Sequence, residues 1–559
     1  MIRPRLAAAL WLLAAAGPAL AAPEAVFEAF EYQGADPVFE PPPPPGRYQN
    51  PIIAGYHPDP SIVRVGADFY MVHSSFAHFP ALPVYHSRNL VDWRLIGHVF
   101  DDPERLDLAG LGTSRGLFAP TIRHHEGRFY VVGTVVDGGG NFVVTAEDPA
   151  GPWSAPVWLP EVDGIDPDLF FDDDGRAWLT HNGPPPGEPR WPTHRAIWQW
   201  AFDPEALRVL PGSAELLVDG GSRPEDEPAW VEGPHLYKID GRYYLLCAEG
   251  GTEENHSEVV FRADHVRGPY HPYPGNPILT QRDLPPDRPA PIANTGHADL
   301  VQTPAGEWWA VFLGVRPYDA AGHFNTGRET FLLPVQWLDG WPRIVAPATP
   351  VPWRPPAPRG LPATPGAEAT TGNFRWRDDF DGPRLSGHWV WLRGGDARDW
   401  ARLADGRLIL RARADRLDGR GRPAFLGRRQ AHTRFSARLT LRPPAAPGLR
   451  AGLAVYYDEG HHDVLGLRRL ADGRLEARLE RADGGPPRMV ARRVLAATGP
   501  IELAVDGRGR ELAYAAGAPG RAEPLGAPLD ARALSTVHAG GFVGVILGPY
   551  AHLETEGAP

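Results

Sequence analysis

In the last third of the chain, apolar and polar residues alternate along short runs, as in strands that bury one face. The runs "GRLILRARA", "FSARLTLRP", "GLAVYYD" and "RLEARLE" show this alternation, and turn signals such as "ADGR" recur between them. We therefore predict an antiparallel β-sandwich for residues 373–559.

Residues 47–345 show a different pattern, in which one unit repeats. Five segments share a small or proline-containing start, an apolar residue, a turn with glycine and an aromatic strand. They are "DPSIVRVGADFYMV", "APTIRHHEGRFYVV", "DPDLFFDDDGRAWLT", "EGPHLYKIDGRYYLL" and "GHADLVQTPAGEWWAV", with the apolar residues Ile62, Ile122, Leu169, Leu236 and Leu300. The units are roughly 60 residues apart, which suits one four-stranded propeller blade each. The predicted fold class is all-β: a five-bladed β-propeller followed by a β-sandwich domain.

Two proline-rich stretches and an apolar leader flank these regions. "FEPPPPPGRYQ" predicts a stiff extended spacer over residues 23–46, and "APATPVPWRPPAPRGLPATPGAEATTG" predicts a linker over residues 346–372. Residues 1–22 combine Arg3 and Arg5 with a short apolar stretch that ends in "ALA", which is typical of a signal peptide. We therefore expect an exported protein, periplasmic or extracellular, with no membrane span in its mature part.

Composition narrows the function classes. The chain of 559 residues holds 63 Gly and 64 Pro, which favours short strands and turns over long helices. Its formal net charge is −12 and its arginines are scattered, so no nucleic-acid-binding face is expected. A single cysteine, Cys247, excludes disulfide bonds within the chain. The oligomeric state is left open.

The repeat places acidic side chains together. In a propeller, the residues that start the inner strands lie around one mouth of the central channel. Comparing the five segments puts Asp59, Ala119, Asp166, Glu232 and His297 at these positions. Three carboxyl groups in a partly desolvated pocket cannot all ionise cheaply, so at least one pKa is raised. One acid then stays protonated while another stays ionised, as general acid–base catalysis requires.

Such a pair of carboxyl groups suits the hydrolysis of glycosidic bonds. One carboxylic acid protonates the leaving oxygen, and in inverting enzymes a carboxylate about 6.5–9.5 Å away activates water. Two acids on different blades, facing each other across the channel, suit this wide separation of the carboxyl groups better than two neighbours on one strand. The alternatives from other classes are a non-catalytic carbohydrate-binding propeller and a structural or partner-binding propeller. The presence of all three acids disfavours the first, and the acidic channel mouth disfavours the second.

The motifs "NPIIAGYHPDPSI", "GIDPDLFFDDDGR", "EGPHLYKIDGRYYLL", "GHADLVQT" and "GRETFLLPV" together resemble glycoside hydrolase family 43. The nearest likeness is to its β-xylosidases and α-L-arabinofuranosidases. The second region resembles the β-sandwich of those enzymes through "AFLGRRQ", "GLAVYY" and "GGFVGVILGPYA". The resemblance implies an inverting exo-glycosidase that releases terminal xylose from xylo-oligosaccharides or hemicellulose side chains. Release of arabinofuranose is the alternative.

The resemblance also implies roles for single residues. Asp59 matches the general base, Glu232 the general acid, and Asp166 a third carboxyl group that tunes and positions the acid. His297 and Arg328 match side chains that line the pocket around the terminal sugar.

Three further expectations concern the pocket. Phe76 and Phe118 are candidate stacking walls for a sugar ring, with ordinary core aromatics as the alternative. The stretch 425–430 is the candidate for a loop of the second region near the active-site mouth. No cofactor and no metal site are predicted: the family admits a structural calcium ion, but Asp172–Asp174 is expected to be a hairpin turn.

Overall fold

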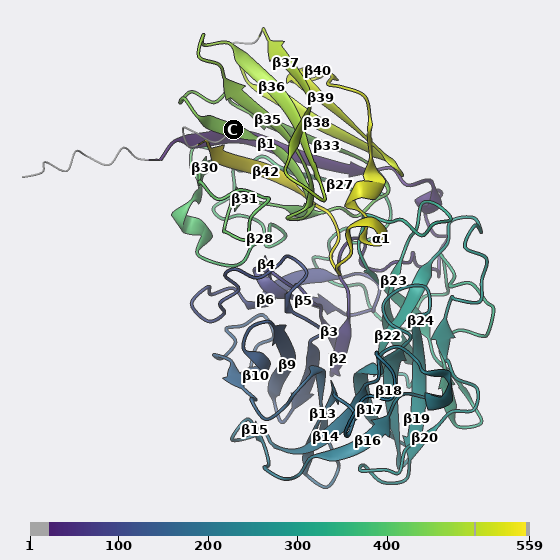
Figure 1. The fold of residues 1–559 in the computed structure, drawn as a ribbon. Coiled ribbons are helices and arrows are strands. Elements are labelled where there is room, and N and C mark those ends of the chain that lie inside the picture. Colours follow the sequence, from purple (N-terminus) through teal and green to yellow (C-terminus); the bar gives the residue numbers. More distant parts are fainter. Residues whose placement is uncertain (1–21, 497–498, 555–559) are drawn as a thin grey trace, which may run out of the picture.

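The computed structural model describes residues 22–496 and 499–554, so residues 1–21 of the predicted signal peptide lie outside the described part. Nearly all of its regular structure is β-strand, and the one α-helix, α1, is the single turn Thr536–Ala539. Figure 1 shows two bodies, a propeller and a β-sandwich, which confirms the predicted fold class.

The propeller has five blades. From the inner to the outer strand, blade one holds β2 (Ser61–Val65), β3 (Asp68–Val72), β5 (Ala81–Ser87) and β6 (Arg94–Phe100), and blade two holds β8 (Thr121–His125), β9 (Arg128–Val136), β10 (Gly140–Ala146) and β11 (Val157–Trp158). Blade three holds β12 (Ile165–Phe171), β13 (Ala177–Gly183), β14 (Ala196–Asp203) and β16 (Glu215–Asp219), and blade four holds β17 (Glu232–Ile239), β18 (Arg242–Glu249), β19 (Ser257–Ala263) and β21 (Leu279–Thr280). Blade five has three strands, β22 (Ala293–Gln302), β23 (Trp308–Val315) and β24 (Glu329–Pro334). The inner strands β2, β8, β12, β17 and β22 contact one another in cyclic order, and so surround the central axis.

Each gap between neighbouring blades is filled by its own cluster of buried apolar side chains. The apolar residue that marks each repeat lies in the gap before its own blade: these are Ile62, Ile122, Leu169, Leu236 and Leu300. Because both faces of every blade are covered, burial of this kind supplies most of the driving force for assembling the ring.

The ring is closed by residues that precede blade one. Ile53 forms a β-bridge to Thr330 of β24, the last strand of blade five. The side chain of Asn50 accepts from the amide of Leu332 at 3.1 Å and donates to its carbonyl at 3.0 Å. The N-terminal segment therefore pairs with the edge of the three-stranded blade.

The second body is a sandwich of two antiparallel sheets. One sheet follows the order β29 (Ala401–Leu403), β30 (Leu408–Arg411), β1 (Glu24–Gly34), β33 (Arg434–Leu441), β38 (Ile501–Arg508), β39 (Glu511–Ala518) and β40 (Arg521–Pro524); the other follows β31 (Ala424–Phe425), β42 (Ile546–Leu553), β34 (Leu449–Asp458), β35 (His461–Arg469), β36 (Leu475–Asp483) and β37 (Arg488–Leu495). Their inner faces share one large core that includes Leu439 of β33 and Leu453 of β34.

Strand β1 corrects the expectation of a spacer over residues 23–46. Residues 24–34 pair with β33 on one side and with β30 and β27 (Arg375–Asp378) on the other. The alternation in "EAVFEAFEY" explains this, since Phe27 and Phe30 are completely buried in the sandwich core. Only the prolines that follow β1 form the extended connection to the propeller.

The two bodies are joined by more than the linker. Strand β28 (Trp391–Leu392), beyond the predicted linker, pairs with β4 (His78–Phe79) of the propeller, so one small sheet spans the boundary. The linker itself runs along the propeller, where the carbonyl of Thr370 accepts a hydrogen bond from the amide of Ala54.

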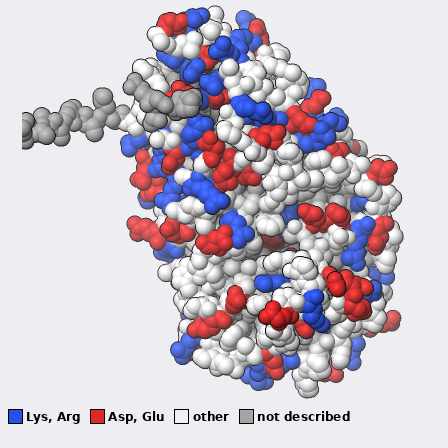
Figure 2. Space-filling model, in the orientation of Figure 1, with Lys and Arg blue, Asp and Glu red and all other residues white. Residues whose placement is uncertain are grey.

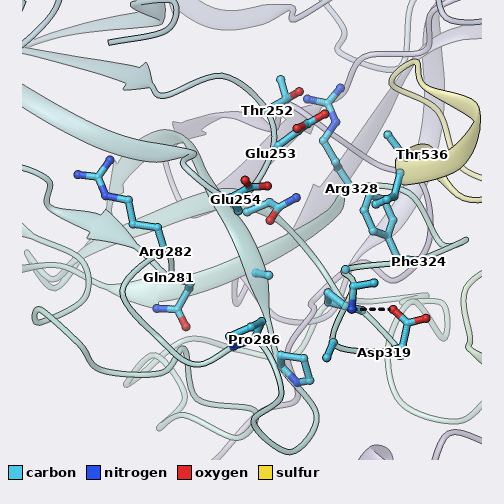
Figure 3. Close-up of a pocket in the computed structure, with 18 of the residues that line it drawn as sticks. Thr252, Glu253, Glu254, Gln281, Arg282, Pro286, Asp319, Phe324, Arg328 and Thr536 are labelled. Atoms are coloured by element: carbon cyan, nitrogen blue, oxygen red, sulfur yellow. Dashed lines mark hydrogen bonds between the residues drawn. The ribbon is translucent and has the colours of Figure 1, made fainter. Parts of the chain in front are cut away.

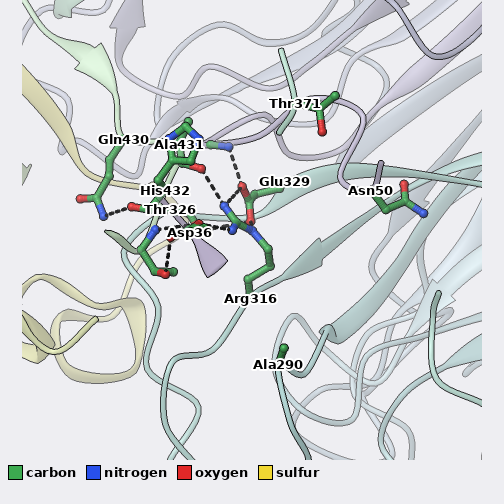
Figure 4. Close-up of polar contacts among 12 residues, drawn as sticks. Asp36, Asn50, Ala290, Arg316, Thr326, Glu329, Thr371, Gln430, Ala431 and His432 are labelled. Carbon is green, nitrogen blue, oxygen red and sulfur yellow. Dashed lines mark hydrogen bonds and ion pairs between the residues drawn. The ribbon is translucent and has the colours of Figure 1, made fainter. Parts of the chain in front are cut away.

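A buried ion-pair network reinforces this boundary (Figure 4). Arg316 of the propeller donates to Asp36 at 2.7 Å, to Glu329 at 2.6 Å and to the carbonyl of Ala431 at 2.7 Å. Asp36 also accepts from the amide of Arg434 at 2.6 Å. One guanidinium group thus connects the segment after β1, the propeller and the sandwich.

Candidate active site

Asp59 lies just before β2, at the channel mouth, and both of its carboxylate oxygens have partners. Arg328 Nη1 donates to Oδ1 at 3.0 Å, and the hydroxyl of Ser74 donates to Oδ2 at 2.5 Å. The residue is only 5% exposed. These two hydrogen bonds hold the carboxylate in one orientation.

Three of the predicted site residues share an unusual backbone conformation. Asp59, Asp166 and His297 have φ angles of 53°, 56° and 53°, in the left-handed region that non-glycine residues rarely adopt. Asp59 lies two residues before β2 and Asp166 is the second residue of β12, whereas His297 lies within β22 where its pairing with β23 shifts. Strained backbone of this kind is concentrated at functional sites, because it aims a side chain that a regular strand would direct elsewhere.

Glu232 does not occupy the same repeat position, which corrects the sequence comparison by one residue. The left-handed position in blade four is Gly233, with φ 55°, and the pairing of β17 with β18 shifts between Glu232 and His235. A side chain at Gly233 would come within 2.8 Å of the imidazole of His297, so glycine is required there. Glu232 therefore reaches the pocket from the residue before the strained position.

The three acids nevertheless lie close enough together for their charges to act on one another. Asp166 accepts a hydrogen bond from the amide of Gly233 at 3.1 Å, which fixes the backbone directly after Glu232. Burial and the negative charge of Asp59 raise the pKa of Glu232 to about 7. Burial and the neighbouring charges of Glu232 and Asp59 also raise the pKa of Asp166 well above its usual value.

Asp59 behaves in the opposite way. Burial alone would raise its pKa, but Arg328, His297 and the hydrogen bond from Ser74 outweigh that effect and lower it. Near neutral pH the pocket thus holds an ionised Asp59 and a Glu232 that can still carry a proton. Two carboxyl groups whose pKa values are pushed apart are equipped to act as base and acid.

Arg195 is a site residue that the sequence comparison missed. Its positive charge acts on both Glu232 and Asp166 and lowers the pKa of each. Two nitrogen atoms of its guanidinium group donate to Oδ1 of Asn182, at 3.2 and 3.0 Å, and the group lies 4.8 Å from the ring centre of Trp230. Nothing in the motif "THRAIW" marks this arginine, because its approach depends on how blades three and four pack.

Aromatic side chains from both domains surround Arg328. Its guanidinium carbon lies 5.9 Å from the ring centre of Phe76 and 5.7 Å from that of Phe542. Phe76 also packs against Phe118, with ring centres 5.1 Å apart, and against Phe542, at 6.0 Å. Phe542 belongs to the sandwich domain, which therefore contributes directly to the site.

Phe76 and Phe118, both expected to be stacking walls for a sugar ring, differ in exposure. Phe76 is only 1% exposed, so it offers almost no surface to a sugar ring and instead supports its neighbours from behind. Phe118 and Phe542 are partly exposed and keep free ring surface. Direct stacking by Phe118 stays a prediction, to which the structure adds Phe542.

The candidate loop at residues 425–430 is placed differently from the expectation. Its strands β31 and β32 (Arg428–Arg429) pair with β42, and Arg429 lies 5.5 Å from the ring centre of Tyr56 behind the pocket. The segment of the sandwich that reaches the mouth is instead 536–542, which includes α1.

A groove of about 680 Å³ opens at this segment (Figure 3). Arg328, Phe324 and Asn294 of the propeller line it together with Thr536 and Phe542 of the sandwich. Because Arg328 both lines the groove and contacts Asp59, the groove leads to the acidic pocket. On the face drawn in Figure 2, acidic and basic side chains are interspersed rather than gathered in a single-sign patch.

An arginine of one inner strand pairs with acidic side chains of two other inner strands. Arg123 of β8 pairs with Asp168 at 2.6 Å and with Asp299 at 3.0 Å, and donates to His235 at 3.0 Å. These acids are already neutralised, so the residues present do not fit the calcium ion that the family admits.

Comparison with known proteins decides what this site belongs to. The family model described as "Glycosyl hydrolases family 43" matches residues 48–342, and the model described as "Beta xylosidase C-terminal Concanavalin A-like domain" matches residues 377–558. The chain belongs to glycosyl hydrolase family 43. It is therefore a glycosidase, and members of this family generally act without a cofactor.

Relatives of known name agree with this membership. The chain is 37% identical over 526 residues to a non-reducing end α-L-arabinofuranosidase of Bacteroides ovatus, covering 90% of this chain and 91% of that one. It is 38% identical over 434 residues to a xylosidase/arabinosidase of Butyrivibrio fibrisolvens, covering 75% and 80%. A crystal structure titled as a GH43_12 from a capybara gut metagenome superposes with a TM-score of 0.89 at 38% identity, covering 95% of this chain and 100% of that one.

Proposed function

We propose that this glycosidase is an inverting, exo-acting β-1,4-xylosidase that releases terminal xylose from xylo-oligosaccharides or hemicellulose side chains. The feature that carries the proposal is the pair of neighbouring acids Asp59 and Glu232, in which Arg328 and Ser74 bind the Asp59 carboxylate and lower its pKa while burial and the charge of Asp59 raise that of Glu232. For the sugar, support comes from a β-xylosidase of Bacillus subtilis, which is 36% identical over 323 residues that span 53% of this chain and 56% of that one.

In the proposed mechanism each of the two acids carries out one step. Asp59, ionised and aimed by Arg328 and Ser74, removes a proton from a water molecule as that water attacks the anomeric carbon. Glu232 donates its proton to the departing glycosidic oxygen, whose bond to the anomeric carbon breaks. The sugar leaves with inverted configuration, Asp59 is then protonated and Glu232 ionised, and exchange of protons with water restores both.

Asp166 acts as a positioning residue in this scheme. It accepts the hydrogen bond from the amide of Gly233, the residue after Glu232, and so holds the acid in place. Its own raised pKa limits the negative charge beside Glu232. We further propose that His297 and Arg328, which are 6% and 7% exposed, contact hydroxyl groups of the terminal sugar.

Exo action follows from the contribution of the sandwich. Phe542 and the segment from Thr536 to Gly541 form one wall of the groove that leads to the pocket. A pocket covered on this side accommodates the end of a chain better than its middle. The proposed substrate is accordingly an oligosaccharide whose non-reducing end enters the pocket.

Release of α-L-arabinofuranose is the second candidate. It is favoured by the Bacteroides ovatus arabinofuranosidase, which matches this chain over both domains rather than over the propeller alone. Both sugars are pentoses, and small differences in a pocket change such preferences by about 1–3 kcal/mol.

The test compares nitrophenyl β-D-xyloside with nitrophenyl α-L-arabinofuranoside, using the wild type and the Asp59→Asn and Asp264→Asn variants. Asp264 carries an exposed side chain and serves as the matched control. We expect hydrolysis of at least one substrate, near-complete loss in Asp59→Asn, and an initial product of inverted anomeric configuration by proton NMR. Retained configuration, or full activity of Asp59→Asn, contradicts the mechanism.

We also propose that the protein is exported. The arginines at positions 3 and 5 and the apolar run that ends in "ALA" support this proposal. Among the described residues, no helix is long and apolar enough to span a membrane. Mass spectrometry of the chain recovered from cell fractions tests it: a mature form that lacks about 21 residues, found outside the cytoplasm, is expected. An uncut chain in the cytoplasm contradicts it.

A further inference from the structure

A cluster of histidine and carboxylate side chains lies in the sandwich, outside the proposed active site. His461 at the start of β35 and Asp483 at the end of β36 are direct cross-strand partners. His538 of α1 approaches from a third element and places Nε2 2.8 Å from Oδ1 of Asp483. One potential ligand atom from each of the three residues lies within 4.8 Å of those of the other two.

A fourth residue orients one of these imidazoles. Oδ1 of Asp458, at the end of β34, lies 2.8 Å from Nδ1 of His461 and also accepts from the amide of Gly460 at 2.9 Å. When Nδ1 carries the proton and donates it to Asp458, Nε2 of His461 has its lone pair available. Metal-binding histidines usually have a carboxylate partner of this kind on their second nitrogen.

We propose that His461, Asp483 and His538 bind a divalent transition-metal ion of the Zn²⁺ type, with water completing the coordination. Two imidazoles and one carboxylate form a ligand set that suits Zn²⁺, Co²⁺ or Ni²⁺. The same set does not suit Ca²⁺ or Mg²⁺, which prefer oxygen ligands alone. The partly exposed position of the cluster leaves a path for the ion to enter.

The proposed metal site would connect the β35–β36 hairpin of the sandwich with α1, which leads into the groove wall. His461 and Asp483 belong to the β35–β36 hairpin of the sandwich, whereas His538 belongs to α1, which continues into Gly541 and Phe542 of the groove wall. A metal ion bound here therefore fastens α1 to the sheet behind it. The inferred role is structural, and it is separate from the acid–base chemistry at Asp59 and Glu232.

The competing explanation is a simple ion pair between His538 and Asp483. The side chains of this pair are 48% and 34% exposed. An ion pair accounts for the contact of these two residues without any metal. It does not require His461 to be present, and it predicts no affinity for Zn²⁺ or Co²⁺. Metal binding therefore separates the two explanations.

The experiment titrates untagged full-length protein with Zn²⁺ by calorimetry and with Co²⁺ by visible absorption. We expect one equivalent per chain in the wild type, and a Kd at least 100-fold weaker in both His461→Ala and His538→Ala. Asp458→Asn is expected to weaken binding by about 10- to 100-fold, as loss of a partner of a ligand does. His271→Ala, which removes an exposed histidine of β20 (His271–Pro272) in the propeller, serves as control and binds like the wild type.

A second measurement guards against misfolded variants. Zn²⁺ is expected to raise the melting temperature of the wild type and of His271→Ala but not of His538→Ala, because only proteins with the site gain stability from the ion. Absence of stoichiometric Zn²⁺ binding by the wild type overturns the proposal. So does a His461→Ala variant that melts normally without metal and still binds one equivalent with unchanged Kd.

Discussion

Arg328 donates a hydrogen bond from Nη1 to Oδ1 of Asp59 at 3.0 Å, although the two residues are 269 positions apart in the chain. The contact joins blade five to blade one at the point where the ring closes. Together with His297 and Ser74, Arg328 also lowers the pKa of the proposed base, Asp59, which burial would otherwise raise. The same contact thus helps to close the propeller and lowers the pKa of Asp59.

Replacing Arg328 with methionine is therefore expected to raise the pKa of Asp59. The reaction requires ionised Asp59, so the acidic limb of the profile of kcat/KM against pH moves to higher pH. Arg242→Met, which removes a half-exposed arginine of β18, is the control and leaves the limb in place. An acidic limb that stays where the wild type has it contradicts the role given to Arg328.

The basic limb reports on Glu232, whose pKa is raised to about 7. Activity is expected to fall above that pH as the acid loses its proton. Arg195 lowers this pKa through its charge, so Arg195→Met raises it further and moves the basic limb to higher pH. The measurement is again kcat/KM against pH, and a shift in the other direction would falsify the arrangement described.

Glu232→Gln removes the proton that the leaving group needs. We expect kcat on xylobiose or an equivalent natural linkage to fall by about 10²- to 10⁴-fold. Hydrolysis of a dinitrophenyl glycoside falls much less, because its leaving group departs without protonation. Asp59→Asn, in contrast, lowers both rates alike. Equal losses on both substrates in Glu232→Gln argue that it is not the general acid.

Phe542→Ala tests whether the sandwich completes the active site. Its ring packs on Phe76 and lies beneath Arg328, so truncation loosens the wall of the pocket. Aromatic contacts of this kind contribute about 0.5–1.5 kcal/mol beyond burial. We expect kcat/KM to fall by about tenfold or more. Trp158→Ala removes a partly exposed aromatic residue of the propeller and should leave kcat/KM unchanged.

Arg316→Met leaves two buried carboxylates, Asp36 and Glu329, without their cation. Breaking a buried pair in this way costs about 3–5 kcal/mol. We expect a markedly lower midpoint of thermal unfolding by calorimetry. Arg359→Met breaks an exposed pair with Glu307 and is expected to change the midpoint by a few degrees at most. Equal effects of the two substitutions would show that the network is not a major source of stability.

Much of the fold could be predicted because its signals are local. The repeat keeps one apolar residue in each inner strand, and Ile62, Ile122, Leu169, Leu236 and Leu300 each fill a separate gap between blades. The same repeat located Asp59, Asp166 and His297 at equivalent strained positions. It displaced Glu232 by one residue, because the glycine in "EGP" takes the left-handed position that Asp59 and Asp166 take in blades one and three.

What the sequence did not reveal depends on contacts between distant parts of the chain. Arg195 comes from a segment without a distinctive motif, and the motif that contains Phe542, "GGFVGVILGPYA", indicates the sandwich but no contact with the propeller. Only tertiary packing brings the two side chains to the pocket. The alternation in "EAVFEAFEY" did indicate a strand, but its partners in β33 lie about 400 residues later. The adjacent prolines led to its assignment as a spacer.

The position of β1 has a consequence for how this enzyme is made. The first strand of the described chain belongs to the middle of the last domain, so it has no strand partner until residues 375–378 of β27 have been synthesised, and its pairing with β33 waits for residues 434–441. The sandwich, unlike the propeller, cannot be excised as one continuous piece of chain: a truncation at the start of the propeller removes the centre of a sheet in the sandwich. A sandwich that is to be moved or engineered must therefore keep the segment that precedes the propeller.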